Sequence, residues 1–519
     1  MTKRAAVYDR FWHSQGGGER HSGMIAEVLS KDGVDVDLIG HSDVDKDVLA
    51  DHLGLDLSRC RMRVVPDRGD LHLEAISREY DLFVNGTYGS RLHPRSRHAA
   101  YLCYFPTPFD ADLSPVRRAL TRTLGPVVRG QSGGVEHGVG WFPPEGGRRR
   151  QWAWTSDDAV LSLSPDTKSR RLRVDLGGPG MPAPRTLTVT DEQGRVLKTV
   201  EVGPEFATHT IEFPSDDGGA VLHFRTETFS PGGSDKRDLG VAASRLRLEG
   251  GRHGPRGMLA FRFPWLLRDP KNLSFLEGYD TVMANSEFTR GWIDTLWHRD
   301  ADVLFPPIQV QRLHAAPERE KAVITVGRFF SPGLGHAKRQ LEMVQFFVRG
   351  VREGVIPADW KLYVVGGMED SQRNYVEQVR TAGAGYPVDV IANAPRSQVE
   401  QLLSTASVFW SATGYGEDER KRPWASEHFG MTTVEAMAGG CVPVVIDRAG
   451  QKEIVRENVD GFRWSTPEEL LARTAEVAGD ETLRARLAAA AVARAQEYSE
   501  DAFAERWHEI VAKHGLLDA

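Results

Sequence analysis

Two glutamates, Glu427 and Glu435, are separated by seven residues and could together hold an anionic ligand that carries hydroxyl groups. Glu427 is expected in a loop, and Glu435 in the first turns of a helix that begins near Gly430. A helix start attracts anions because its first amides are unpaired and carry about half an elementary positive charge. Glu435 could accept hydrogen bonds from a diol, and Glu427 could face a sugar hydroxyl. A helix start stabilised by charge, with no ligand, is the alternative. The amides concerned belong to Phe429, Gly430, Met431 and Thr432.

Two cations precede these glutamates in the sequence. Arg328 follows an expected strand that ends at Val326, and Lys338 lies further along the same connection. Fixed cations beside a helix start can neutralise the charge that develops when a diphosphate leaves, which is electrostatic catalysis and requires no metal ion. Without further context, the same two side chains would be interpreted as a solvated loop pair.

The first part of the chain is expected to form a parallel sheet. A strand at 5–8, the run Gly16, Gly17 and Gly18, a helical repeat and a strand at 34–40 follow one another. Strand, glycine turn, helix and strand make a βαβ unit, whose strands are parallel. Further strands are expected at 82–85, 100–105 and 279–285, with a helix at 286–297.

The pattern changes between about Gly130 and Gly251, where apolar and polar residues alternate and no helical repeat is found. Short strands with this alternation predict an antiparallel β-sandwich, jelly-roll-like, inserted into the first α/β unit. The segment 191–194 is expected to close a hairpin. Most aromatic rings here fit core packing, whereas Trp152 and Trp154 share a strand face and are the candidates for contact with carbohydrate. The alternating runs are 171–176, 208–213, 221–229 and 245–248.

A second α/β series follows a polar, proline-containing linker at 306–320. Two such units facing each other would place a ligand between the carboxyl ends of their sheets. The expected strands are 323–326, 361–365, 388–392, 408–411 and 442–446, and an amphipathic helix is expected at 501–514. The predicted domains are therefore 1–130 with 253–315, the insertion 131–252, the second α/β domain 316–500, and a terminal helix within 501–519.

The stretch from Glu427 to Gly440 resembles the E-x7-E signature of retaining family 4 glycosyltransferases of the GT-B fold. The resemblance covers nearly the whole chain except the expected sandwich. The order of the segments is similar to the branch that contains the mannosyltransferases of lipid-linked oligosaccharide assembly. The matching segments are Gly16 to Arg20, Ala284 to Arg290, Phe305 to Pro307, Val326 to Phe329 with Lys338, and Val364 to Gly367.

This resemblance implies an α/β GT-B fold and transfer of a hexose, with retention, from a nucleotide diphosphate sugar to a glycan or glycolipid acceptor. It assigns Arg328 and Lys338 to the donor diphosphate and Glu435 to the nucleotide ribose. Glu427 and the amides of 429–432 would hold the donor sugar and phosphate, and Gly16–Gly18 would lie beside the diphosphate on the acceptor side. Members of the family need no metal ion, so none is expected here.

One position departs from the family pattern. Many relatives carry a histidine before the Phe-Pro or Tyr-Pro pair, where this chain has Tyr104 followed by Phe105. A tyrosine can donate a hydrogen bond to a sugar but is a poor base near neutral pH. Tyr104 is therefore a candidate on the acceptor side, and a purely packing role is equally open.

Composition and remaining motifs exclude other classes. A net charge of −7 and a pI near 6.2 argue against nucleic acid as a partner. The first glycine turn lacks the G-x-G-x-x-G fingerprint, which disfavours a dehydrogenase. Three widely spaced cysteines and 17 histidines show no metal-ligand pattern, so neither a metal nor another cofactor is expected. Of the two Asp-x-Asp patterns, 35–37 is interpreted as a solvent-facing strand edge and 43–45 as a helix N-cap.

No signal peptide or membrane-spanning stretch is recognised, so a cytoplasmic protein is expected, with peripheral contact at the inner membrane face as an option. A segment with Val116, Leu120 and four arginines could touch anionic lipid, although a solvated helix face is favoured. The arginines are Arg117, Arg118, Arg122 and Arg129.

Two alternatives to glycosyl transfer stay open: a nucleotide-sugar epimerase of the same fold and a non-catalytic glycan-binding scaffold.

Overall fold

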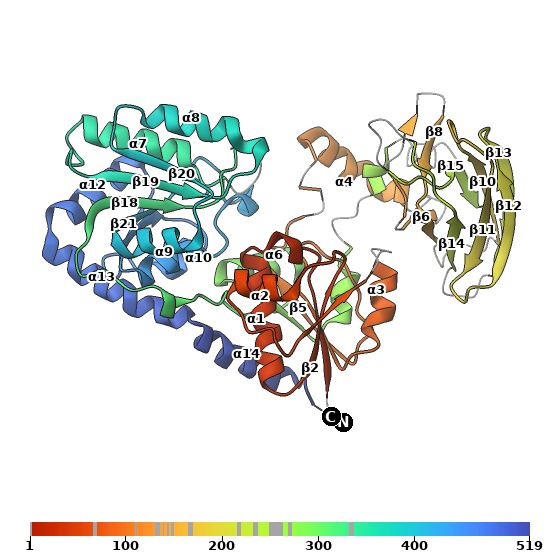
Figure 1. The fold of residues 1–519 in the computed structure, drawn as a ribbon, viewed down its shortest axis with the longest axis horizontal. Coiled ribbons are helices and arrows are strands. Elements are labelled where there is room, and N and C mark those ends of the chain that lie inside the picture. Colours follow the sequence, from red (N-terminus) through yellow and green to blue (C-terminus); the bar gives the residue numbers. More distant parts are fainter. Residues whose placement is uncertain are drawn as a thin grey trace.

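The computed structural model contains two α/β bodies and one antiparallel β body (Figure 1). The carboxyl-terminal α/β body lies at the left of the figure, the amino-terminal one at its lower centre, and the β body at its right. The described residues are 3–65, 70–108, 110–111, 113–129, 135–138, 140–142, 145–146, 150–163, 170–214, 220–231, 237–248, 263–267, 272–331 and 337–518.

The amino-terminal body is a seven-stranded parallel sheet in the order β17-β16-β5-β4-β1-β2-β3. Its core strands are apolar on both faces, because helices cover both sides of a parallel sheet. The predicted strands and the helix after the glycine run are confirmed. The strands are β1 (Arg4–Tyr8), β2 (Asp35–Gly40), β3 (Arg61–Val64), β4 (Leu82–Asn85), β5 (His98–Cys103), β16 (Thr281–Ala284) and β17 (Asp302–Val303), and the helices α1 (Gly17–Lys31), α2 (Lys46–Leu53), α3 (Asp70–Ser77), α4 (Pro115–Arg129) and α6 (Glu287–Trp297).

The carboxyl-terminal body is a six-stranded parallel sheet in the order β20-β19-β18-β21-β22-β23. All strands expected from the second α/β series are confirmed, while the short edge strand β23 was not predicted. The strands are β18 (Glu320–Val326), β19 (Lys361–Gly366), β20 (Val388–Ala392), β21 (Ala406–Ser411), β22 (Val442–Ile446) and β23 (Phe462–Trp464). The helices are α7 (Gln340–Arg352), α8 (Arg373–Gly383), α9 (Arg396–Thr405), α10 (Met431–Ala438), α11 (Gln451–Ile454), α12 (Pro467–Gly479) and α13 (Glu481–Ala495).

The last helix, α14 (Glu500–His514), returns from the carboxyl-terminal body to the amino-terminal one (Figure 1). Ser499 caps its first turn. Phe503, Trp507 and Ile510 are buried in the same core cluster as strands β1, β2 and β4. The helix predicted at 501–514 is therefore confirmed, and its apolar face joins the two α/β bodies.

Two five-stranded antiparallel sheets occupy the region of the predicted sandwich. Leu172, Val174 and Leu176 point into their shared core, as the alternation predicted. The hairpin at 191–194 is also confirmed, because the Asp191 carboxylate accepts the amides of Gln193 and Arg195. The predicted boundaries at 131 and 252 lie outside the described residues. The sheets are β13 (Ala207–Glu212), β10 (Arg171–Gly177), β15 (Ala242–Leu248), β8 (Gln151–Trp154) and β7 (Glu145–Gly146), and β12 (Val196–Val202), β11 (Arg185–Asp191), β14 (Ala220–Thr226), β9 (Asp158–Leu163) and β6 (Val135–His137).

Two interpretations of single positions are wrong. Trp154 is 3% exposed and belongs to the sandwich core, so it cannot contact carbohydrate, and Trp152 packs against Phe206. Asp37 lies on an internal strand rather than a solvent-facing edge, where the Tyr80 hydroxyl donates to its buried carboxylate. The N-cap interpretation of Asp45 is confirmed, since its side chain accepts two amides of α2.

Candidate active site

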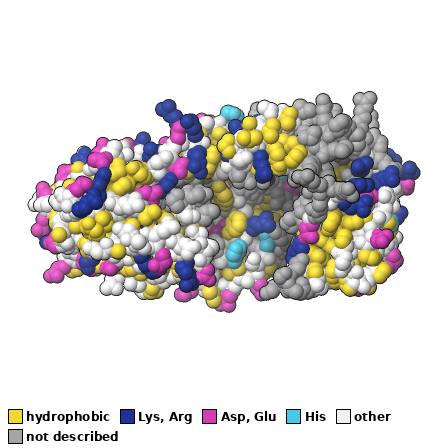
Figure 2. All heavy atoms as spheres, turned by 90° about the horizontal axis from the view of Figure 1, so that it is seen from above, with side chains coloured by type: hydrophobic (Ala, Val, Ile, Leu, Met, Phe, Trp, Pro, Cys, Tyr) yellow, Lys and Arg dark blue, Asp and Glu magenta, His cyan; other side chains and the backbone are white. Residues whose placement is uncertain are grey.

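The glycine turn after β1 faces the start of α10 from the opposite body. A methyl group placed on Gly17 would lie 2.7 Å from the Met431 sulfur, and one placed on Gly16 would lie 3.6 Å from the Arg328 guanidinium. From above, the middle of the molecule is hollowed, and Lys or Arg and His side chains gather in the hollow (Figure 2). The two sheets thus bring the predicted glycines and part of the predicted charge cluster together.

The glycine turn is held by its own helix. Glu19 accepts the amide of Gly16 at 2.5 Å and the Ser14 hydroxyl at 2.8 Å, which forms a capping interaction at the start of α1. The Glu19 carboxylate satisfies hydrogen-bond donors at the start of α1. The turn therefore has a fixed shape opposite α10.

Helix α10 starts where the sequence predicts. Gly430 is its N-cap residue with φ of +119°, a value that residues with a side chain rarely adopt. The Phe429 ring is buried against Phe305 and Tyr498, so only its backbone is available to a ligand. These aromatic contacts hold the helix start in place, and Met431 in its first turn lies against the glycine turn.

Glu427 and Lys338 form an ion pair beside this helix start. The Lys338 Nζ lies 2.5 Å from the Glu427 Oε2, and the Thr413 hydroxyl donates to the same oxygen at 3.1 Å. Lys338 also packs over Gly327, where a methyl group would lie 2.7 Å from its Cγ. The two side chains are 24% and 18% exposed and can therefore be reached from solvent.

Arg328 extends from the end of β18 and is exposed. Its guanidinium lies over the Phe330 ring, 5.6 Å from the ring centroid, and reaches toward the glycine turn. Because Lys338 covers the neighbouring Gly327, both predicted cations lie at one edge of the sheet. The predicted basic pair is thus brought together by the fold.

Glu435 lies deeper, with 9% of its surface exposed. Its Oε1 accepts a hydrogen bond from the Arg396 guanidinium at 2.8 Å, and Arg396 also pairs with Glu400. Arg396 is the first residue of α9. A carboxylate held in this way keeps lone pairs for a diol.

Tyr104 contacts the glycine turn directly. Its hydroxyl donates to the carbonyl oxygen of Gly18 at 2.7 Å and lies 3.3 Å from the Ser22 hydroxyl, which donates to Asp9. Burial raises the pKa of Tyr104 well above its ordinary value of 10, so the phenol does not act as a base at neutral pH. Burial, together with the charge of Glu19, also raises the pKa of Asp9 to about 8.

Comparison with known proteins identifies the carboxyl-terminal body. Residues 310–494 match the family model for Glycosyl transferases group 1. They form a group 1 glycosyltransferase domain. The chain is also similar over 98% of its length, and over all of the other chain, to the crystal structure of Anabaena Alr3699/HepE in complex with UDP and glucose, with a TM-score of 0.51 and 12% identity. The fold is GT-B, as predicted.

Two curated relatives that this chain resembles are mannosyltransferases. It is 29% identical to the GDP-Man:Man(3)GlcNAc(2)-PP-Dol alpha-1,2-mannosyltransferase of Dictyostelium discoideum, over 36% of this chain and 38% of the relative. It is 24% identical to the alpha-1,3/1,6-mannosyltransferase ALG2 of Mus musculus, over 50% of this chain and 69% of the relative. The match thus spans little more than a third of the first relative's length.

Sequence patterns alone missed two residues beside the candidate site. Arg396 follows a proline at a helix start, and Asp9 follows β1, but no motif marks either of them. Each is recognised only by its contacts, with Glu435 on α10 and with Ser22 on α1. Glu435 lies 39 residues from Arg396 in the sequence, whereas Ser22 lies 13 residues from Asp9.

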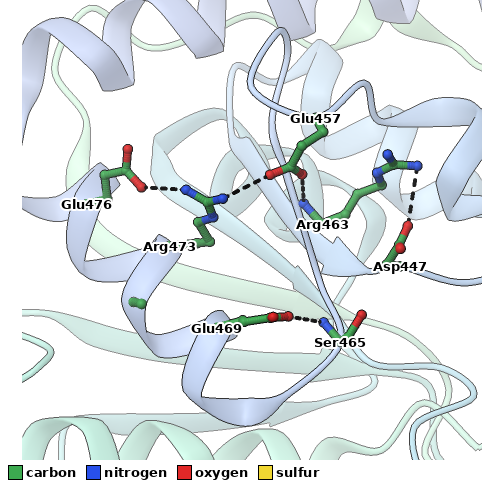
Figure 3. Close-up of a pocket in the computed structure, with 8 residues that line it drawn as sticks. Asp447, Glu457, Arg463, Ser465, Glu469, Arg473 and Glu476 are labelled. Atoms are coloured by element: carbon green, nitrogen blue, oxygen red, sulfur yellow. Dashed lines mark hydrogen bonds and ion pairs between the residues drawn. The ribbon is translucent and has the colours of Figure 1, made fainter.

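A separate pocket of about 440 Å³ lies between α12 and β23 in the group 1 domain and contains none of the predicted site residues (Figure 3). Its charged groups bind one another: Arg473 pairs with Glu457 and Glu476, and Arg463 pairs with Asp447. Its lining holds four carboxylates and two arginines, so both arginines are neutralised and the pocket is acidic overall. Across the described ranges, no group of three or more His, Cys, Asp or Glu side chains is placed to hold a metal ion. No helix within those ranges is both long and apolar enough to cross a membrane.

Proposed function

We propose that this chain is a retaining, metal-independent glycosyltransferase that moves a hexose from a nucleotide diphosphate sugar to a glycan or lipid-linked glycan. The observation that carries the proposal is the convergence of Arg328, Lys338, Glu427 and the α10 start opposite the glycine turn. Three positive elements at one edge of a sheet are suited to a diphosphate.

In the proposed reaction, the bond between the anomeric carbon and the diphosphate oxygen breaks, and its electron pair leaves with the diphosphate. Arg328, Lys338 and the amides of 429–432 stabilise this charge. The acceptor hydroxyl attacks the same face of the sugar, and its proton passes to the departing phosphate oxygen. No side-chain base is required, which agrees with the commitment of the Tyr104 hydroxyl to Gly18.

Glu435 is assigned to the ribose of the donor and Glu427 to the donor sugar. Gly16, Gly17 and Gly18 would let the acceptor approach the diphosphate closely, and Tyr104 would act on that side by holding the turn. GDP-mannose is the first donor to test, because GDP-Man occurs in the name of a relative. UDP-glucose is the second, since a structural neighbour was crystallised with UDP and glucose.

The proposal includes peripheral membrane contact through α4, beside which a lipid-linked acceptor would enter. The sequence favoured a solvated basic face, and Arg117 and Arg122 are indeed exposed. Arg118, however, donates to the carbonyl oxygens of Asp110, Ala111 and Leu113. The helix also exposes an apolar stripe, with Val116 at 70%, Leu120 at 38% and Leu124 at 42%. An apolar stripe flanked by arginines fits an anionic lipid surface.

The test incubates the full chain with GDP-mannose or UDP-glucose, with and without a polyprenyl-diphosphate-linked glycan, in the presence of EDTA. We expect acceptor-dependent release of nucleoside diphosphate and a product with the anomeric configuration of the donor. Conversion of the donor without acceptor would favour an epimerase. Donor binding without turnover of any acceptor would favour a glycan-binding scaffold. Inversion of configuration, or complete loss of activity in EDTA, would contradict the proposed mechanism.

A further inference from the structure

Helix α11 of the carboxyl-terminal body contacts α6 of the amino-terminal body through one carboxylate. Glu453 Oε2 accepts the amide of Glu287 at 2.8 Å, and its Oε1 accepts the amide of Phe288 at 3.0 Å. These are the first two amides of α6, and the side chain of its N-cap residue Ser286 accepts the amide of Thr289. First-turn amides lack partners in their own helix, so a carboxylate from outside satisfies them and their partial charge.

An aromatic contact lies beside this carboxylate. The His428 ring stacks on Phe105 with centroids 4.3 Å apart and planes inclined by 17°, and Phe288 lies 6.4 Å from His428 on a nearly parallel plane. Phe105 and Phe288 belong to the amino-terminal body, whereas His428 follows Glu427 of the donor site. The same α6 residue therefore offers its amide to Glu453 and its ring to His428.

Helix α11 is tightly joined to the donor-site loop. The amide of Gly450 donates to the carbonyl oxygen of Glu427 at 3.0 Å, and a methyl group on Gly450 would lie 2.6 Å from Phe429 Cα. Gln451 accepts the hydroxyl of Thr433 on α10 at 3.0 Å. A displacement of Glu453 is therefore transmitted to the loop 427–429 through direct backbone contacts.

Charged and polar groups from both bodies surround Glu453. From α6 it faces the charge of Glu287, which is paired with Arg290. On its own side, Arg494 and Tyr498 donate to the Glu453 carbonyl oxygen and so hold α11 in place. Burial raises the pKa of Glu453 to about 7, while the two α6 amides oppose this shift.

We propose that Glu453 is a positioning residue, which docks the start of α6 onto the donor-site loop and sets the domain arrangement in which transfer occurs. This inference rests on the proposed function for its effect on catalysis, but its effect on domain position does not depend on it. Because both oxygens of its carboxylate are taken up by α6 amides, loss of Glu453 should lower kcat and let water reach the donor, while nucleotide affinity is kept.

The decisive comparison is between two variants that differ in whether residue 287 keeps its backbone amide hydrogen. Glu287→Pro removes the N–H that Glu453 accepts, and proline is well tolerated at the first position of a helix. The preceding Ser286 is extended, with φ of −167° and ψ of 162°, as a residue before proline must be. Glu287→Ala is the matched control, since it loses the same side chain and keeps the amide. Glu453→Ala removes both acceptors, and Glu453→Gln restores one of them.

Two measurements are made on the full chain. The first is the distance between spin labels at Asp47→Cys and Asp370→Cys, one in each body, against a background of buried native cysteines. The second is kcat, the ratio of donor hydrolysis to transfer, and the Kd of the nucleoside diphosphate. We expect Glu287→Pro and Glu453→Ala to broaden the label distance and to lower kcat about tenfold, with Kd within about twofold of the parent. Glu453→Gln is expected to fall between, and Glu287→Ala to match the parent.

Equal label distances and equal kcat in Glu287→Pro and Glu287→Ala would overturn the proposal. If the parent protein transfers sugar from no donor, the label distances still decide whether Glu453 docks the bodies, and only the proposed function fails. If Glu453→Ala does not fold, the Glu287→Pro and Glu287→Ala pair gives the same comparison without a change at Glu453.

Discussion

Lys338 and Glu427 come from segments 89 residues apart and form an ion pair of 2.5 Å at the end of the carboxyl-terminal sheet. A third group, Thr413, binds the same carboxylate oxygen. The short ion pair holds the Lys338 ammonium group beside the start of α10. In the proposed reaction, this relationship would fix a cation in advance where the diphosphate develops charge.

Replacing Lys338 by alanine should lower the rate of sugar transfer by about 10²- to 10³-fold, because the departing diphosphate loses a fixed cation. The measurement is kcat/KM with the donor identified in the activity screen. Lys321→Ala is the control, since Lys321 pairs with Asp359 on the surface of the same body. An unchanged kcat/KM in Lys338→Ala would exclude Lys338 from the donor site.

Glu435→Ala should weaken binding of the nucleoside diphosphate by roughly 10- to 100-fold, because a hydrogen bond to a charged acceptor contributes about 1.5–3 kcal/mol. Isothermal titration calorimetry measures the change. Glu400→Ala is the matched control, as Glu400 binds the same Arg396 from the other side. If both variants lose affinity equally, Glu435 acts only by holding Arg396.

Gly17→Ala should reduce transfer about tenfold, since its methyl group would meet the Met431 sulfur at 2.7 Å and shift the glycine turn from α10. The Gly17→Ala, Met431→Ala double variant should regain activity relative to the single one, because the clash is removed. Gly291→Ala, at a helical position with open space, controls for the general effect of adding a methyl group. Absence of rescue would show that the turn and α10 do not meet in the active protein.

The contribution of Asp9 to stability should fall as pH rises between about 4 and 8, whereas His21 and His137, whose pKa values burial lowers to about 3 and about 4, contribute in the opposite direction below about 6.5. Burial and Glu19 raise the pKa of Asp9 from 3.8 to about 8, so in this range the folded chain holds a proton that the unfolded chain has lost. The stabilisation is complete below the unfolded pKa and is lost as pH rises through the folded one. Glu453, with a pKa of about 7, contributes in the same direction.

Urea unfolding at several pH values tests this expectation. Asp9→Asn should remove up to about 1.4 kcal/mol per pH unit from the slope between pH 5 and 7. Asp47→Asn, whose side chain is 91% exposed, should leave the slope unchanged. An identical slope in the parent and in Asp9→Asn would show that Asp9 is ionised in the folded protein.

Membrane contact through α4 predicts that Leu120→Asp and Leu124→Asp reduce co-flotation with vesicles containing phosphatidylglycerol, because each places a charge in the apolar stripe. Val459→Asp alters an exposed apolar residue of the other α/β body and should not affect flotation. All three proteins should unfold at similar temperatures. Flotation that is equal for all variants would exclude α4 as the contact.

Much of the fold could be predicted because its signals are local. The apolar runs of β1 and β18 to β22 mark strands buried on both faces, and Gly430 marks the start of α10 through a backbone conformation that glycine adopts best. The alternation in β10 predicted which side chains enter the sandwich core. Trp154 was misassigned because alternation gives a shared face but not the direction in which that face points.

The sequence alone therefore determined the two parallel sheets, the antiparallel sheets inserted within the first of them and the residue types of the proposed donor site, since each depends on neighbours within a few turns or strands. Tertiary structure decided that Arg396 binds Glu435, that Tyr104 binds Gly18, that α14 packs on the amino-terminal body and that Glu453 meets α6. These contacts join residues far apart in the chain. Their partners are set by how whole sheets and helices pack, which no local pattern records.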